Sequence, residues 1–300
     1  MKKNIFCILF FLCLNILFFS YRLFYNGNEL INFLNEKIYT SQYIKIVTMS
    51  MDEMFIESLE NRNHIIYAES TYFDEKDCNL NIIKKSGSEG YLHEKFIIFD
   101  DNSVLFGTGN LTKNGFLNTF NIFIYTEDKK LVEVFLKEIG NFERNLYGKN
   151  KKSIYSKLST SLGKVKFYNS PSEKVYGEIL SEIKKSKEKI EIFTYSFTDP
   201  FFIYELENAS FKEKNIFILS DEWNLIYNSP LKNTVSLNIK YIPGIHAKTI
   251  IIDEKVLIIG SYNFTYRARE VNDEFVLIIF NEELSQKISK KFKELWNNIL

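Results

Sequence analysis

The hydrophobic pattern of the chain passes through the same order of elements twice. Stretches with helical spacing alternate with short runs rich in Val, Ile, Phe and Tyr, as expected for helices packed on a sheet. The first half predicts helices at residues 28–39, 52–62 and 130–146, and strands at 43–49, 63–68, 94–99, 103–106 and 120–126. The second half predicts helices at 172–185, 201–208 and 282–298, and strands at 164–168, 189–194, 215–219, 247–252, 256–259 and 274–280. We therefore expect an α/β (mixed α+β) fold made of two similar sheet-and-helix halves.

The first 22 residues do not belong to this repeat. Lys2 and Lys3 precede an apolar run over residues 5–19, and Arg22 follows it. A charged start before an apolar run is typical of a secretory signal, although the run is also close to the length of a membrane anchor. We expect residues 1–22 to be a signal peptide or an N-terminal membrane anchor. Because positive charge holds the N-terminus inside, the body of the chain is expected outside the cytoplasm, exported or membrane-anchored.

The repeat also sets the expected division of the body. Residues 23–150 would form the first half and residues 151–300 the second. The segment 149–160 is rich in Lys and Ser, so it is interpreted as the connection between the halves.

Composition narrows the chemistry that the chain can perform. Lys+Arg and Asp+Glu are both 38, so the formal net charge is zero, which counts against a dedicated binder of long nucleic acid. The chain has three Cys and three His, and two of the cysteines lie in the apolar leader. Cys78 alone in the body cannot build a multi-cysteine zinc site. We therefore expect no metal and no cofactor.

The repeat is sharpest in two segments that share a motif. They are HEKFIIFDDNSVLFGTGN and HAKTIIIDEKVLIIGSYN. The first contains His93, Lys95, Asp100, Gly107 and Asn110, and the second contains His246, Lys248, Asp253, Gly260 and Asn263. Each pair is separated by the same number of residues, as in 246 − 93 = 153 and 263 − 110 = 153. Such a uniform offset argues against coincidence and for one shared site.

The spacing within each motif indicates what the site would contain. Residues i and i+2 of a strand project from one face, so each His would point with its Lys. Asp100 and Asp253 fall where each strand would turn, and Gly107 and Gly260 would allow a tight turn that brings Asn110 and Asn263 back toward the lysines. Two imidazoles, two ammonium groups and two amides suit the stabilisation of a transferring phosphoryl group.

With these residues, the chain resembles the phospholipase D superfamily, whose members carry two His-x-Lys-x4-Asp motifs, each followed by a Gly-Ser-x-Asn segment. The resemblance extends from about residue 43 to residue 300 and includes the run IEIFTYSFTDPFFIYEL. It implies two halves related by a pseudo-twofold axis, with both motifs at one interface. It also implies a covalent phosphohistidine intermediate and no metal requirement. Because both motifs lie in one chain, a monomer suffices for a complete site.

The resemblance assigns roles to particular residues. The catalytic set would be His93, Lys95, Asp100, His246, Lys248 and Asp253, with Asn110, Asn263, Thr108 and Ser261 binding the substrate phosphate. In the family, a downstream Asn-x-Glu carboxylate orients the histidine of the opposite half. Asn272 and Glu274 match that segment, whereas the corresponding position of the first half is Asn121, since 274 − 153 = 121. A carboxylate makes an imidazole more nucleophilic, so His93 is expected to attack phosphorus and His246 to act as acid and base.

The motif does not name the substrate. A phospholipid headgroup ester, hydrolysed at a membrane surface, is the first expectation because of the leader and the neutral net charge. The alternatives are a metal-independent endonuclease acting on DNA or RNA, a phosphatidyl transferase resembling cardiolipin synthase, and an inactive binding module. His64 has Phe217 at its matching position and is interpreted as structural.

Overall fold

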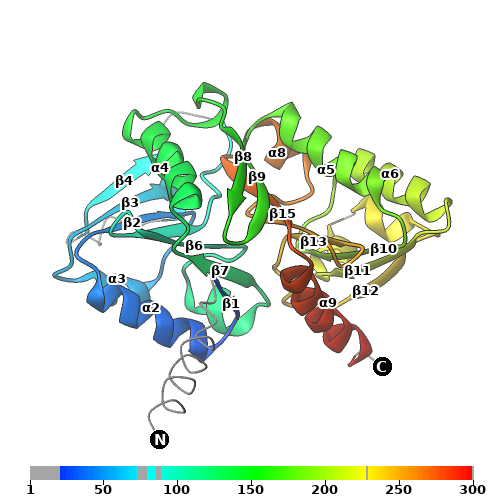
Figure 1. Ribbon diagram of the computed structural model, residues 1–300, viewed down its shortest axis with the longest axis horizontal. Helices are drawn as coiled ribbons and strands as arrows, with labels where there is room; N and C mark the ends of the chain where they lie inside the picture. The colour runs from blue at the N-terminus through cyan, green and yellow to red at the C-terminus, as the bar shows by residue number, and fades with distance from the viewer. Residues whose placement is uncertain (1–20, 73–79, 86–88, 228, 299–300) are drawn as a thin grey trace, which may run out of the picture.

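The computed structural model describes residues 21–72, 80–85, 89–227 and 229–298. Two sheets lie side by side, each carrying helices (Figure 1). Helices α2 (Asn28–Thr40) and α3 (Glu53–Leu59) cover the first sheet from below, and α5 (Glu173–Lys185) and α6 (Pro200–Ser210) cover the second from above. The expected α/β fold of two similar halves is confirmed.

The first half is a seven-stranded mixed sheet with the order β1-β7-β6-β5-β2-β3-β4. Its strands are β1 (Tyr21–Tyr25), β2 (Ile44–Thr48), β3 (His64–Glu69), β4 (Ile82–Lys85), β5 (Phe96–Phe99), β6 (Ser103–Gly107) and β7 (Ile122–Thr126). Besides α2 and α3 it contains α4 (Lys129–Glu143) and the short helical turns η1 (Ser70–Tyr72), η2 (Asn114–Asn118) and η3 (Gly148–Asn150).

The second half is an eight-stranded sheet with the order β12-β11-β10-β13-β14-β15-β9-β8. Its strands are β8 (Tyr155–Thr160), β9 (Gly163–Ser170), β10 (Lys189–Thr194), β11 (Asn215–Ser220), β12 (Asn238–Tyr241), β13 (Thr249–Ile252), β14 (Val256–Gly260) and β15 (Glu274–Phe280). Its remaining helices are α7 (Trp223–Ile226), α8 (Tyr266–Glu270), α9 (Glu282–Asn297) and the turn η4 (Pro230–Asn233).

The two sheets have the same strand order once β8 is set aside. Strand β1 occupies the position of β9, β7 that of β15, and β6, β5, β2, β3 and β4 those of β14, β13, β10, β11 and β12. Helix α4 corresponds to α9, and both begin with the same kind of cap. The side chain of Asp128 accepts from the backbone N–H groups of Lys130 and Leu131, and that of Asn281 accepts from Leu284. The two halves in Figure 1 thus share their strand order and also the N-cap side chains at which α4 and α9 begin.

Two strands lie where the sequence pattern predicted other features. Strand β1 pairs with β7 from Tyr21 onward, so Tyr21 and Arg22, expected in the leader, belong to the first sheet. The rest of the expected leader, residues 1–20, lies outside the described residues. Strand β8 forms a hairpin with β9, so residues 155–160 of the expected connection are part of the second sheet. No helix among the residues that the structure describes is long and apolar enough to span a bilayer.

The halves are held together by an apolar core that belongs to both. Phe135 of α4 packs against Phe167 of β9 and Phe275 of β15, with ring centroids 5.2 and 5.3 Å apart. Phe96 and Phe106 from the first sheet also contact Phe275 edge to face. Buried residues of α9 join the same cluster. Burial of these rings away from water fixes the relative position of the two sheets.

Gly107 and Gly260 are needed for a reason other than the tight turn expected from the sequence. Each is the last residue of its strand, and a Cβ atom there would lie 2.5 Å from the carbonyl oxygen of Ile122 or 2.1 Å from that of Phe275. Only glycine allows the neighbouring backbones to approach so closely. These contacts set the distance between the motif strand and its neighbour, which directly follows Asn121 in the first half and begins at Glu274 in the second.

We predict that Gly260→Ala lowers the free energy of unfolding by about 2 kcal/mol, because backbone must move to admit the methyl group. Gly177→Ala is the matched control. Gly177 lies within α5 with open space around its Cβ position, so alanine there should stabilise the helix by about 0.5–1 kcal/mol. Urea unfolding followed by circular dichroism measures both changes, and equal stability of the two variants would contradict the prediction.

Candidate active site

The two histidine motifs meet at the interface between the halves. Each histidine lies in an extended segment that leads into the first strand of its motif, β5 or β13, and each segment pairs with the other half. The backbone N–H of His93 donates to the carbonyl of Asp273 at 3.0 Å, and that of His246 donates to Phe120 at 3.0 Å. The isolated bridges Leu92–Asp273 and Phe120–Ile245 mark the same two crossings. The expectation that His and Lys lie on the strands is therefore wrong by a few residues, because these segments pair across the interface rather than within a sheet.

The ring of His93 is held by a carboxylate from the opposite half. Its Nδ1 lies 2.8 Å from Oε2 of Glu274, which is fully buried at the start of β15. The amide of Asn272 donates to Oε1 of the same carboxylate at 3.2 Å. Burial raises the pKa of Glu274 to about 7, against the lowering effects of Lys95 and the Ser261 hydroxyl. With Nδ1 donating to Glu274, the lone pair of His93 lies on Nε2.

His246 has a neutral partner in the corresponding place. Its Nδ1 lies 3.0 Å from Oδ1 of Asn121. The amide of Asn121 donates to the Gly115 carbonyl at 2.9 Å and to the Thr119 hydroxyl at 3.0 Å, which fixes its oxygen toward the histidine. The crossed, unequal pairing expected from the sequence, Glu274 with His93 and Asn121 with His246, is present in the structure.

Both motif lysines are buried beside the histidines. Nζ of Lys248 donates to the carbonyl of Thr108 in the other half at 3.1 Å and lies 3.0 Å from Nδ1 of His246. Lys95 donates to the carbonyl of His93. Burial lowers the pKa of Lys95 to about 7 and, with the nearby charge of Lys95, lowers that of Lys248.

The two lysines and two imidazoles form one electrostatic unit. Burial lowers the pKa of both histidines well below the ordinary range, and both Lys95 and Lys248 lower each of them further. The carboxylate of Glu274 bonds His93, and its charge acts on both Lys95 and Lys248. The arrangement suits a phosphate anion, whose charge would favour the protonated forms of the lysines.

The remaining motif residues separate into two groups. Oδ1 of Asn110 and Oδ1 of Asn263 are buried and have no hydrogen-bond partner among the described residues, so each amide has an unused acceptor. The Thr108 hydroxyl instead donates to Asn121 at 2.9 Å and accepts from the backbone of Ile122. The Ser261 hydroxyl accepts from the backbone of Phe275 and also bonds Glu274. Thr108 and Ser261 therefore support the orienting residues, which corrects the expectation that they bind phosphate.

The structure does not bring Asp100 and Asp253 to the site. They lie at the far ends of β5 and β13, where both have positive φ. Oδ1 of Asp100 accepts from the backbone of Gln42 and Tyr43, and Asp253 accepts from residues 187–189. The catalytic role expected for them is therefore corrected to a structural one, because each ties the motif hairpin to its neighbouring strand.

A buried ionic cluster behind the site was not anticipated. Nζ of Lys151 contacts Glu138, lies 2.8 Å from Oε1 of Glu94 and lies 3.4 Å from Oδ1 of Asp273. Lys85 holds the other oxygen of Asp273 at 2.8 Å. Because side chains alternate along an extended backbone, Glu94 points away from His93 and Lys95, and Asp273 points away from Glu274. Lys151 thus links Glu94, which lies between His93 and Lys95 in the sequence, to Asp273, which directly precedes Glu274. The only sequence signal was a charged residue, Glu94, at the position where the second motif has Ala247.

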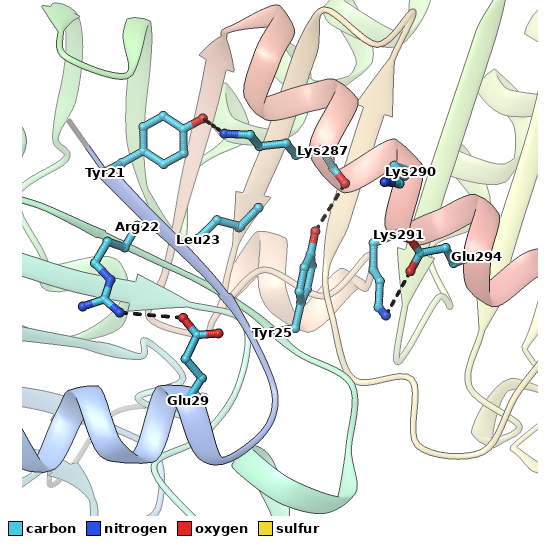
Figure 2. A pocket seen from close by; sticks show the side chains of 9 residues that line it. All are labelled: Tyr21, Arg22, Leu23, Tyr25, Glu29, Lys287, Lys290, Lys291 and Glu294. Carbon is cyan, nitrogen blue, oxygen red and sulfur yellow. Dashed lines mark hydrogen bonds and ion pairs between the residues drawn. The ribbon is translucent and has the colours of Figure 1, made fainter. Parts of the chain in front are cut away.

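A separate groove lies between β1 and α9 (Figure 2). It has a volume of about 780 Å³. Arg22 pairs with Glu29 on one wall. Lys287 extends from α9 toward Tyr21 of β1, and Lys291 pairs with Glu294 within α9. None of the nine residues that line the groove belongs to either histidine motif, so it is distinct from the candidate active site.

We predict that Lys151→Met costs about 3–5 kcal/mol in the free energy of unfolding, because three buried carboxylates lose their shared cation. Lys166→Met is the matched control. Lys166 also pairs with two carboxylates, Glu178 and Glu182, but its side chain is more exposed to water, so its loss should cost about 1 kcal/mol or less. Denaturant unfolding compares the two variants, and an equal cost for both would contradict the assigned role of the cluster.

The raised pKa of Glu274 predicts opposite effects of Glu274→Gln on activity and stability. The folded state holds a proton that the unfolded state releases between the ordinary pKa of 4.5 and about 7. The free energy of unfolding of the wild type therefore falls as pH rises through that window, because Glu274 must ionise while buried. Glutamine does not ionise, so the stability of Glu274→Gln relative to wild type should rise across the window, to a gain of about 3 kcal/mol at pH 8. Turnover should fall by at least about 100-fold, because His93 loses its anionic partner. Unfolding curves at pH 4.5 and 8 test this, and a variant less stable than wild type at pH 8 would contradict it.

Comparison with known proteins agrees with this geometry. The family described as "Cardiolipin synthase, PLD-like domain" matches residues 15–143 and 179–296. A phospholipase D of Rickettsia conorii is 30% identical over 184 residues, which are 53% of this chain and 92% of that protein. Cardiolipin synthase C of Escherichia coli is 46% identical over 49 residues, which are 16% of this chain and 10% of that protein. The crystal structure of phosphatidylserine synthase from Haemophilus influenzae shares the fold, with a TM-score of 0.64, 13% identity and coverage of 93% of this chain and 86% of that one. With two halves, two motifs and one shared interface, this chain belongs to the phospholipase D superfamily.

Proposed function

We propose that the chain is a phosphodiesterase of the phospholipase D type that hydrolyses the headgroup ester of a phospholipid through a phosphohistidine intermediate. The observation that carries this proposal is the crossed pairing of Glu274 with His93 and of Asn121 with His246. It gives two histidines at one interface different electrostatic partners, which suits a division of roles between a nucleophile and a general acid–base in two successive displacements at phosphorus.

His93 is the proposed nucleophile. Its Nε2 attacks phosphorus while the bond from phosphorus to the headgroup oxygen breaks. His246, whose protonated form is favoured by the negative charge of the bound phosphate, gives that oxygen its proton. His246 then takes a proton from water as the water oxygen attacks phosphorus and the phosphorus–nitrogen bond breaks. The products are phosphatidate and the free headgroup alcohol, and both histidines return to their starting state. Glu274 stabilises the positive charge that develops on His93.

The non-bridging oxygens of the phosphate are assigned to four residues, Lys95, Lys248, Asn110 and Asn263. The two lysines have pKa values lowered by burial, so the negative phosphate would draw protons onto them and strengthen its own binding. This cationic set performs the charge stabilisation, and the proposed steps require no metal ion.

The phospholipid substrate and the reaction with water draw support from the relatives. The Rickettsia relatives are named phospholipase D and match more of this chain than the named cardiolipin synthases do. The expected placement of the body outside the cytoplasm, exported or membrane-anchored, is part of the same proposal. An alcohol in the place of water would convert the same intermediate into a transferred phosphatidyl group, as the cardiolipin synthase relatives suggest. The ratio of phosphatidate to transferred product in the presence of glycerol measures which acceptor is used.

We predict that His93→Ala and His246→Ala each lower hydrolysis of phosphatidylcholine by at least about 10³-fold. His64→Gln is the matched control. His64 lies at the start of β3, with Nδ1 2.8 Å from the Arg62 carbonyl and Nε2 accepting from the backbone of Asn81, so it is structural. The control should retain turnover. Choline release by the full chain, with EDTA present, is the measurement.

Three outcomes would contradict the proposal. If both alanine variants stay active, the mechanism is wrong. If EDTA abolishes turnover, the metal-free chemistry is wrong. If single-stranded DNA is cut and lipid is left intact under the same conditions, the substrate class is wrong and the site is that of a nuclease.

A further inference from the structure

A row of aromatic rings leads from His246 to the surface of the second half. The ring of Tyr195, directly after β10, lies 4.8 Å from the imidazole of His246. Trp223 follows at 5.9 Å from Tyr195, and Tyr227 stacks on Trp223 at 4.8 Å. Tyr195 and Trp223 are half-buried, whereas Tyr227 is 62% exposed. The rings thus connect the acid–base histidine to water in three steps.

The outer end of this row carries apolar side chains that face water. Leu225 is 45% exposed and Ile226 is 73% exposed, and both lie in the single turn α7 beside Tyr227. We call Leu225, Ile226 and Tyr227 the apolar tip. An exposed cluster of this kind, next to an active site, marks a surface for an apolar partner.

The apolar tip is fixed to the residues that hold His246. The buried amide of Asn224 donates to the carbonyl of Tyr195 at 2.7 Å and accepts from the backbone of Phe197 at 2.9 Å. The carboxylate of Asp221 accepts from the backbone of Trp223 and from that of Gly244, each at 2.8 Å. Gly244 lies two residues before His246. The tip is therefore a rigid projection of the catalytic loops.

The charges near the tip distinguish between partners. Asp221 and Glu222 directly precede α7, so the tip carries acidic and not basic neighbours along the chain. A polyanion such as DNA, or a strongly anionic bilayer, would be repelled by them. Leu and Ile beside Trp and Tyr form the combination that partitions into the boundary between headgroups and acyl chains.

We propose that the apolar tip inserts into the surface of a zwitterionic phospholipid bilayer and delivers the lipid phosphate to His246 along the aromatic row. This inference rests on the proposed phospholipase function and specifies how its substrate is reached. It assigns the recognition of bilayer lipid to Leu225, Ile226 and Tyr227, while the chemistry stays with the histidines.

The test compares one headgroup chemistry in two physical states. The full chain is assayed on phosphatidylcholine vesicles and on dibutyrylphosphatidylcholine, which is monomeric in water. The double variant Leu225→Gln, Ile226→Gln should lose at least about tenfold in turnover of vesicles and should keep wild-type turnover of the monomeric lipid. Glutamine leaves the net charge unchanged, so the substitutions do not alter electrostatic repulsion between the protein and the vesicles. Val235→Gln is the matched control, because Val235 is 93% exposed on the same half and should affect neither substrate.

A second readout follows the tip itself. The chain has two tryptophans, and Trp296→Phe leaves Trp223 as the sole one. We expect the fluorescence of Trp223 to be quenched by phosphatidylcholine that carries a spin label near the headgroup. The Leu225→Gln, Ile226→Gln substitutions should remove at least half of this quenching.

The outcomes separate this inference from the proposed function. If the double variant hydrolyses vesicles as fast as wild type, or if Trp223 is not quenched, the inference is wrong and the phospholipase proposal stands. If wild type hydrolyses neither form of phosphatidylcholine, the proposed function fails instead. If the double variant loses turnover of the monomeric lipid as well, the tip acts on catalysis and not on the bilayer, which also overturns the inference.

Discussion

The site depends on one interaction repeated across the interface, the contact of each motif histidine with a residue of the opposite half. Glu274 of the second half bonds His93, and Asn121 of the first half bonds His246. Neither half contains a complete set, so the proposed chemistry requires the two sheets to be docked. The shared aromatic core around Phe135 provides the apolar attraction for docking, and the backbone crossings at Asp273 and Phe120 set its register.

The site places several ionisable groups in the protein interior, where the charged form of each is disfavoured. Two lysines, two histidines and a carboxylate are removed from water. Burial lowers the pKa of Lys95 and raises that of Glu274, because it disfavours the charged form of each group. The buried cluster around Lys151 lies directly behind them and keeps Glu94 and Asp273 in place. Rigid support of this kind holds the two lysines and two histidines in fixed positions, where a phosphate anion would meet them.

Much of the fold and of the candidate site could be predicted from the sequence, because a constant offset between the two halves identifies the elements and residues that correspond in the structure. The 153-residue offset identified β5, β6, β7 and α4 together with their copies, and it also identified the unequal partners Asn121 and Glu274. The outer strands β1, β4, β8 and β12 were missed, because runs of four to six residues give too little pattern to distinguish a strand from a loop. Lys151 could not be found, because its partners are distant in sequence and a single lysine in a polar segment is ordinarily solvated. The aspartates of the motifs were misassigned, because proximity in sequence to His and Lys does not reveal that the strand carries them to its other end.

The unequal roles proposed for the two histidines can be tested by a single measurement. The full-length chain with His246→Asn is mixed with phosphatidylcholine, quenched within milliseconds to seconds, digested and examined by mass spectrometry under conditions that preserve phosphoramidates. We expect a phosphatidyl adduct on the peptide that contains His93, because this variant can form the intermediate slowly and hydrolyses it still more slowly. An adduct on the peptide that contains His246 in the reciprocal His93→Asn variant, with His93 unmodified in the first, would contradict the assignment of Glu274 as the partner of the nucleophile.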